Sequence, residues 1–242
     1  MKRRWIILAA VLVFLVTLVA EFPAQWAAGA LPRGIRCREL AGSLWSGSCV
    51  DLAHDAVDLG DLSWTVHPAR LLAGRLSVDV SLEMPQRPAL VVGIELRPGG
   101  AIDAHDARGS LTLDRQLVPQ LPAGTAAVAD FELGSLSFDG QRVTVLVGHV
   151  DVHGLRSGST PLGDYRLTFA PAASDEPVGH IQDLGGPFEV EGSLRLNRAP
   201  GYELSVLVAP RAGAPSDAVQ ALKVLGSADA QGRRPFTMEG TF

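Results

Sequence analysis

The feature that most constrains this fold is a strict alternation of apolar and polar residues that recurs along the chain. In residues 75–84, which read Arg-Leu-Ser-Val-Asp-Val-Ser-Leu-Glu-Met, every second side chain is apolar. Because successive side chains of a strand point to opposite faces of the sheet, this pattern predicts a strand with one buried and one wet face. The same pattern predicts strands over residues 143–152, 165–169, 188–196, 202–208 and 236–242. One-sided alternation indicates antiparallel pairing, since parallel strands are usually buried on both faces.

Glycine placement predicts that this sheet is curved. The tripeptide Gly-Ser-Leu begins at Gly42, Gly109, Gly134 and Gly192, with spacings too irregular for a solenoid repeat. We expect each of these glycines to be a bend at which a strand turns or curves. A curved sheet of this size has to cover its apolar face by closing, folding over or binding something.

Two short segments break the alternation and predict helices. Residues 216–225 are the better candidate, because Ser216 can cap the start and Gly226 can stop the end. A helical turn is expected over residues 114–121. Neither segment carries a set of catalytic residue types.

The N-terminus predicts a membrane anchor. The cations of residues 2–4 stand directly before an unbroken apolar run, residues 5–20, with Trp5 and Trp26 on either side. Basic residues stay on the cytoplasmic side, and tryptophan favours the membrane–water interface. The segment between the two tryptophans is long enough as a helix to cross a hydrocarbon core of about 30 Å.

A cleaved signal peptide is the alternative to an anchor. Ala28-Gly29-Ala30 fits the small-x-small cleavage rule but lies far from the apolar run. We therefore predict that residues 5–22 remain in the inner membrane. Residues 1–30 would form the cytoplasmic stub, the transmembrane anchor and a juxtamembrane segment. Residues 31–242 would form a mainly β periplasmic domain, a curved and extended antiparallel sheet with one or two short helices.

Charge and cysteine content narrow the class of protein further. The net charge is −5 and only Lys2 and Lys223 are lysines, so the basic surface that nucleic acid requires is missing. Cys37 and Cys49 are the two cysteines, and in an oxidising periplasm we expect them to form a disulfide across a glycine-containing hairpin. A redox site is the less favoured interpretation, because there is no Cys-x-x-Cys.

Motifs that carry catalysis are missing from the sequence. It contains no Gly-x-Ser-x-Gly, His-Glu-x-x-His, Gly-x-x-x-x-Gly-Lys or Gly-x-Gly-x-x-Gly, so neither an enzyme nor a cofactor site is predicted. The best metal candidate is His149-x-Asp151-x-His153, whose three side chains would share one strand face. Val150 and Val152 supply the apolar face there, so we interpret the three polar residues as a solvated strand face.

Several short motifs resemble one protein family. They are Leu40-Ala-Gly-Ser-Leu-Trp-Ser-Gly-Ser48, Leu62-Ser-Trp64 and residues 68–74, together with residues 162–165, 201–204, 221–226 and 234–236 near the C-terminus. This arrangement resembles the type II secretion system protein N family, also called general secretion pathway protein N. The positions that carry the resemblance are Gly42, Ser43, Leu44, Trp45, Gly47, Trp64, Pro68, Gly74, Tyr165, Tyr202, Leu222 and Gly226.

The resemblance implies a non-catalytic, inner-membrane accessory component of the machine that exports folded proteins across the outer membrane. Its partners would be other envelope or secretion-system proteins. The Gly-Ser-Leu-Trp-Ser-Gly segment also resembles AsmA-like envelope proteins. That alternative implies a lipid-handling or envelope-homeostasis role, in which the sheet shelters acyl chains. Trp45 and Trp64 are expected to be large apolar anchors in the core.

Overall fold

The computed structural model describes residues 17, 21–27, 34–54, 57–84, 88–115, 121, 123–171, 176–197, 201–222 and 226–241. Over these residues the chain is mainly β and divides into two compact units, Met1–Leu96 and Arg97–Phe242, here called unit 1 and unit 2. Among the described residues, no helix is both long and apolar enough to cross a membrane. The predicted anchor falls mostly on residues 1–16 and 18–20, outside the described part.

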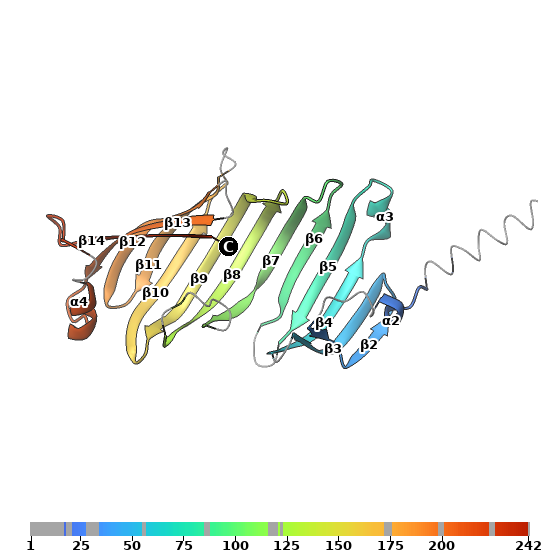
Figure 1. The fold of residues 1–242 in the computed structure, drawn as a ribbon, viewed down its shortest axis with the longest axis horizontal. Coiled ribbons are helices and arrows are strands. Elements are labelled where there is room, and N and C mark those ends of the chain that lie inside the picture. The colour runs from blue at the N-terminus through green and yellow to red at the C-terminus, as the bar shows by residue number, and fades with distance from the viewer. Residues whose placement is uncertain are drawn as a thin grey trace, which may run out of the picture. The chain divides into compact units, whose positions relative to one another are not determined.

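Unit 1 is an antiparallel sheet with two one-turn helices (Figure 1). The spatial order of its strands is β1-β3-β4-β5-β6, and β2 also pairs with β3. Its elements are α2 (Ala24–Ala27), β1 (Ile35–Arg36), β2 (Glu39–Gly42), β3 (Ser46–His54), β4 (Val57–Val66), α3 (Pro68–Leu71), β5 (Leu76–Glu83) and β6 (Leu90–Leu96).

Unit 2 is an antiparallel meander in which each strand pairs with the next along the chain. Short connections of this kind are the simplest way to build an antiparallel sheet. Its elements are β7 (Ile102–Leu113), β8 (Thr125–Phe138), β9 (Val143–Ser157), β10 (Thr160–Phe169), β11 (Val178–Gly185), β12 (Phe188–Asn197), β13 (Gly201–Pro210), α4 (Ser216–Leu222) and β14 (Arg234–Thr241).

The strands predicted from alternation are confirmed. Residues 75–84 become β5, and the other five predicted stretches lie within β9, β10, β12, β13 and, apart from residue 242, β14. The predicted helix at Ser216 is α4, which ends at Leu222; residues 223–225 lie outside the described part. The expected helical turn at 114–121 falls almost wholly outside it, on residues 116–120.

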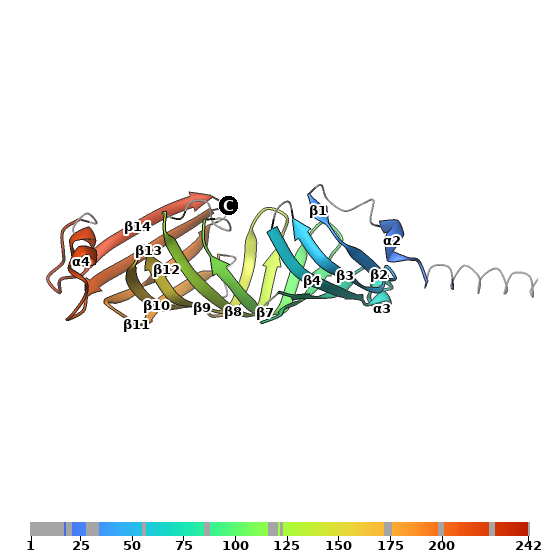
Figure 2. The ribbon, with the colours of Figure 1, turned by 90° about the horizontal axis from the view of Figure 1, so that it is seen from below.

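The sheet of unit 2 is curved, so that strands far apart in the sequence line one cavity. Leu113 of β7 and Phe236 of β14, the first and last strands of this unit, line the same cavity. Figure 2 shows β13 and β14 passing over the face of the neighbouring strands. Register shifts interrupt the β8–β9 ladder between Leu133 and Ser135 and the β9–β10 ladder around Gly163. Bulges of this kind bend a strand and increase its twist.

The glycine prediction is only partly right. Gly42 is a turn residue with φ +91°, and Gly134 is the extra residue of the β8 bulge. Gly109 and Gly192 instead pair regularly with Phe131 and Val206 inside long strands. At Gly192 an added Cβ would lie 2.3 Å from the Ser205 carbonyl oxygen, so this glycine serves close strand approach and not a bend.

Candidate functional site

The Gly-Ser-Leu-Trp-Ser-Gly motif forms the tight hairpin between β2 and β3. The Ser43 N–H donates to the Ser46 carbonyl at 2.8 Å, and the Ser43 hydroxyl oxygen accepts from the Trp45 and Ser46 N–H groups at 3.2 Å. Gly42 has φ +91°, and a Cβ there would lie 2.5 Å from the Ser46 carbonyl oxygen. The turn therefore requires glycine at this position.

Trp64 packs over Gly47 on the neighbouring strand. The two residues are direct partners in the β3–β4 ladder. A Cβ on Gly47 would lie 2.4 Å from Cζ2 of the indole, so the ring occupies the place of the missing side chain. The indole N–H of Trp64 donates to the Leu44 carbonyl at 3.2 Å, which ties the ring to the hairpin turn. These contacts place Trp64 in local packing, as expected for a structural tryptophan.

The two cysteines form a disulfide at the same hairpin. Cys37 and Cys49 have Cα atoms 5.7 Å apart, within the usual range for a bridge. Cys49 is 2% exposed and is paired with Leu40 in the β2–β3 ladder. Cys37 precedes β2, so the two cysteines are not direct partners in the β2–β3 ladder. The bridge instead fastens the segment before β2 to the middle of β3.

The remaining motif of unit 1 shapes the connection from β4 to β5. Pro68 begins α3, where its fixed φ suits the first turn of a helix. Gly74 has φ +71° and ends the following turn. The N–H of His67 donates to the Ser77 carbonyl at 2.8 Å, which joins this connection to β5.

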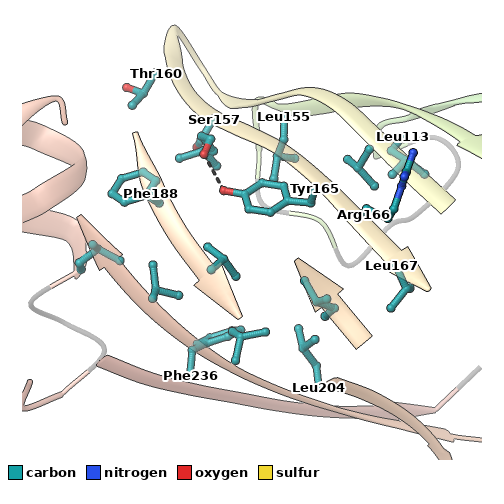
Figure 3. A pocket seen from close by; sticks show the side chains of 17 residues that line it. Leu113, Leu155, Ser157, Thr160, Tyr165, Arg166, Leu167, Phe188, Leu204 and Phe236 are labelled. Carbon is teal, nitrogen blue, oxygen red and sulfur yellow. Dashed lines mark hydrogen bonds between the residues drawn. The ribbon is translucent and has the colours of Figure 1, made fainter. Parts of the chain in front are cut away.

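An apolar groove lies in unit 2, with a volume of about 850 Å³. Such a volume lies within the range of about 300–1,000 Å³ typical of ligand pockets. Figure 3 shows Tyr165, Phe188 and Phe236 directed into this common space. The groove is lined by Leu113, Val152, Leu155, Ser157, Thr160, Leu162, Tyr165, Arg166, Leu167, Ile181, Phe188, Val190, Leu204, Val206, Val208, Leu222 and Phe236.

One face of the alternating strands builds the groove wall. On β13 the lining residues are Leu204, Val206 and Val208, every second residue of the strand. Phe188 and Val190 of β12 repeat this spacing. The curvature of the sheet therefore converts a flat apolar face into a concave apolar wall, which is how the unit partly covers that face.

Tyr165 is one of four polar residues that line the groove, together with Ser157, Thr160 and Arg166. Its hydroxyl donates to the Leu162 carbonyl at 2.6 Å, so the group is satisfied within the protein (Figure 3). Burial raises the pKa of Tyr165 to about 12, and the nearby Asp183 carboxylate adds to the effect. The phenol is therefore neutral at physiological pH and does not act as a base.

The predicted family-motif positions fall into two groups, one in each unit. Gly42, Ser43, Leu44, Trp45, Gly47, Trp64, Pro68 and Gly74 lie in unit 1, around the hairpin and α3. In unit 2, Tyr165 and Leu222 line the groove, and Gly226 follows α4 with φ +110°. Tyr202 lies on β13, where its ring fills the space beside Gly240: a Cβ there would lie 2.7 Å from the ring.

His149, Asp151 and His153 point to three different partners on neighbouring strands. Arg166 makes a two-pronged contact with Asp151, with nitrogen–oxygen distances of 2.5 and 2.6 Å. His149 lies 3.9 Å from Glu132, and His153 lies 3.7 Å from Asp130. The hydrogen bond from Arg166 lowers the pKa of Asp151. In the part of the chain that the structure describes, no three His, Cys, Asp or Glu side chains are arranged to hold a metal ion.

Most groove residues were not singled out from the sequence. Tyr165 and Leu222 are family-motif positions, and Leu204 and Phe236 lie within the motifs 201–204 and 234–236, whereas Phe188 and Val206 are predicted only as members of apolar strand faces. The alternation identified the face on which these side chains lie. The bulges that bend β8 to β10 carry no comparable pattern.

The geometry defines an antiparallel β protein with an apolar groove in unit 2. The chain belongs to the type II secretion system (T2SS) protein N family, whose model matches residues 33–237. It is 25% identical over 250 residues to the type II secretion system protein N of Vibrio cholerae serotype O1, covering 94% of each chain. It is 26% identical over 255 residues to the protein of that name from Aeromonas hydrophila, covering 99% of each chain. No solved structure gives a significant match.

Proposed function

We propose that this chain is a non-catalytic accessory component of the type II secretion system, anchored in the inner membrane with its β units in the periplasm. The observation that carries the proposal is the family match over residues 33–237, which spans both units. The cations of residues 2–4 and the apolar run 5–20 support the anchor and its orientation. The disulfide between Cys37 and Cys49 agrees with an oxidising compartment.

The partners proposed for this role are other secretion-system proteins of the envelope. Both relatives carry the name of a secretion-system component, and a component of such a machine works by contact with its neighbours. Residues 1–30 would serve as stub, anchor and juxtamembrane segment, and residues 31–242 as the periplasmic part. The exposed apolar surfaces of the two units are the natural contact areas for such partners.

Deletion of the gene tests this function. We expect extracellular levels of folded exoproteins to fall and the same proteins to accumulate in the periplasm. Complementation with the full chain should restore export. Normal secretion in the deletion strain, with loss of outer-membrane integrity instead, would contradict the proposal.

A second candidate function is lipid handling of the AsmA-like kind, and the groove of unit 2 favours it. Its wall is mostly aliphatic and aromatic, and one of its polar groups, the Tyr165 hydroxyl, already has a partner. A volume of about 850 Å³ is ample for an acyl chain. An occupant of this kind would gain affinity from burial of its methylene groups, at about 0.8 kcal/mol each.

A groove variant separates the two candidates. Leu204→Glu places a charge in the groove, whereas Ser205→Glu places the same charge on the opposite face of β13. If the groove binds acyl chains, a fluorescent fatty acid should bind the wild type and Ser205→Glu but at least tenfold more weakly to Leu204→Glu. Val208→Trp, which fills the groove without adding charge, should also weaken binding. Equal binding by all four proteins would dismiss the lipid candidate.

A further inference from the structure

The connection between β4 and β5 exposes two leucines that its own fold does not use. Every residue from His67 to Arg75 is exposed, and α3 buries none of its side chains. Leu71 is 42% exposed and Leu72 is 94% exposed, the most among the large apolar residues described. Two leucine side chains that stay in water contribute no burial free energy to the turn that carries them. The pair is therefore suited to contact with an apolar phase.

This connection is held firmly in place. Backbone bonds run from Leu72 N–H to the Ala69 carbonyl and from Gly74 N–H to the Leu71 carbonyl, at 3.3 and 2.9 Å. The guanidinium groups of Arg70 and Arg75 lie 3.0 and 3.6 Å from the two carboxylate oxygens of Glu95 on β6. The leucines are therefore presented by an ordered turn, and little freedom is lost when they insert elsewhere.

The turn lies at the end of unit 1 where the chain enters from the apolar N-terminal run. The Leu44 N–H donates to the Phe22 carbonyl at 2.9 Å, and Pro23 forms a bridge with Ser43. Phe22 and Pro23 follow the apolar run of residues 5–20, with Glu21 in between. The β2–β3 hairpin turn is also joined to the end of β4, because the Val66 N–H donates to the Trp45 carbonyl at 2.6 Å.

The α3 connection follows β4 immediately at this end. Pro68 begins α3 two residues after Val66, the last residue of β4. Figures 1 and 2 both show α2 and α3 on the same side of unit 1. Leu44, in the hairpin turn, is itself 42% exposed. The exposed leucines therefore gather at the end of the unit that follows the apolar run.

We propose that Leu71 and Leu72 insert into the periplasmic leaflet of the membrane from which the chain emerges, so that unit 1 touches the lipid surface at a second point. This inference rests on the proposed N-terminal anchor. Arg70 and Arg75 flank the leucines and share one carboxylate, so one positive charge remains to face lipid phosphate groups. Leucines between arginines are the composition of an interfacial membrane contact.

The proposed N-terminal anchor explains why a contact of only two leucines is sufficient to orient unit 1. The proposed anchor ends at Phe22, which is hydrogen-bonded to the hairpin turn, so the anchored chain keeps the α3 turn at high effective concentration beside the bilayer. Two leucines alone would bind a vesicle weakly, whereas the same pair on an anchored chain needs only to bias the orientation of unit 1. The consequence is a fixed orientation of the unit 1 sheet relative to the membrane.

A depth measurement on the full chain tests this proposal. The chain is reconstituted in vesicles of phosphatidylethanolamine and phosphatidylglycerol, with a nitroxide on Leu72→Cys or, as the control, on Glu83→Cys at the other end of β5. Because Cys37 and Cys49 are bridged, only the introduced thiol takes the label. We expect the label at 72 to relax more strongly with oxygen than with a water-soluble nickel complex. The label at 83 should show the reverse.

Alkaline carbonate extraction of the same vesicles separates the two proposals. A chain that is retained, with a label at 72 as accessible to nickel as the label at 83, overturns the docking alone. A chain that is extracted overturns the anchor, and the docking with it. Retention with a lipid-exposed label at 72 supports both.

Discussion

In both units an aromatic ring covers a glycine of the neighbouring strand, yet the surfaces of the two units differ. In unit 1, Trp64 covers Gly47, and its indole N–H closes the neighbouring hairpin turn. In unit 2, Phe169 covers Gly179 and Tyr202 covers Gly240, yet a groove of about 850 Å³ remains beside them. Local packing of the same kind therefore occurs in both units, and unit 2 also presents an open apolar wall.

Strand length, more than the presence of bulges, distinguishes the two units. The longest strand of unit 1, β4, has 10 residues, whereas β8 and β9 of unit 2 have 14 and 15. The β8–β9 and β9–β10 ladders each contain more than one register shift, as does the β3–β4 ladder of unit 1. Long bulged strands coil, and a coiled sheet brings its own apolar face around a central space. Unit 2 can hold an apolar occupant, whereas unit 1 offers exposed side chains at its α3 turn.

The largest effect is expected from Gly47→Ala, which tests the packing of unit 1. The new Cβ would lie 2.4 Å from the Trp64 ring and 2.6 Å from the Ala41 carbonyl oxygen, so the ring or the strand has to move. We expect a loss of about 3 kcal/mol in the free energy of unfolding, the upper part of the range for overpacking. Thermal and denaturant unfolding of the full chain measure it.

Gly134→Ala is the matched control in unit 2. The only atom that its Cβ would approach within 4 Å is the Val147 carbonyl oxygen, at 4.0 Å. We expect a change within about 0.5 kcal/mol, as for an ordinary surface substitution. Equal losses in the two variants would contradict the assignment of Gly47 as the place that receives the Trp64 ring.

Removal of the disulfide should also act on unit 1 alone. The bridge closes a loop between residues separated by 12 positions, and the chain-entropy estimate for such a loop is about 3 kcal/mol at most. For the double variant Cys37→Ala/Cys49→Ala we expect faster hydrogen exchange in β2 and β3 and unchanged exchange in β9 to β13. Equal acceleration in both units would show that the bridge supports more than the hairpin.

The sequence was sufficient to predict six of the strands and a curved sheet, but not the positions at which the strands bend. Alternation located six strands and the face on which their apolar residues lie, because period two is a direct consequence of strand geometry. The four Gly-Ser-Leu tripeptides were given one role, and the structure gives them several: Gly42 forms a turn, Gly134 a bulge, and Gly192 a close approach between strands. Glycine permits a turn, a bulge or a close approach between strands, and which of the three occurs depends on the neighbouring strand.

The candidate site shows the same limit more clearly. Tyr165 and Leu222 were chosen for their motifs and prove to line the groove. Phe188 and Val206 line it as well, but nothing in their local sequence distinguishes them from other apolar strand residues. A groove formed by strands far apart in sequence depends on how far the sheet bends, and bending is a property of the whole ladder.

A smaller effect is expected from Tyr165→Phe, which tests the wall of the groove. The substitution removes the 2.6 Å hydrogen bond to the Leu162 carbonyl but keeps the ring. We expect a loss of about 1 kcal/mol in the free energy of unfolding, the usual net value for such a bond. Binding of an apolar ligand should persist, since the ring still lines the groove. Loss of that binding would show that the hydroxyl contacts the ligand directly.

The same variant predicts a change at alkaline pH. The pKa of Tyr165 is raised from 10 to about 12 in the folded chain, so folding favours the neutral phenol. The neutral phenol therefore contributes to the free energy of unfolding. This contribution is fully present below pH 10 and is lost as the pH rises toward 12. Melting curves of the wild type should therefore fall more steeply than those of Tyr165→Phe between pH 10 and 12. Parallel curves would contradict the burial of this phenol.

The smallest effect is expected from the triple variant His149→Ala/Asp151→Ala/His153→Ala, on the face of β9 opposite Val150 and Val152. The partners of these three residues lie on neighbouring strands and are largely solvated, so the melting temperature should change by less than about 3 °C at neutral pH. The pKa of Asp151 is lowered by its hydrogen bond from Arg166. The ionised Asp151 carboxylate therefore stabilises the folded chain above the ordinary carboxyl pKa, and this stabilisation disappears as the pH falls through the lowered pKa of Asp151. At that low pH the melting temperatures of the variant and the wild type should converge. Export of folded proteins should be unchanged at equal protein abundance. A loss of export with a normal melting temperature would show that this polar face, and not only the apolar surfaces of the two units, contacts a partner in the secretion machine.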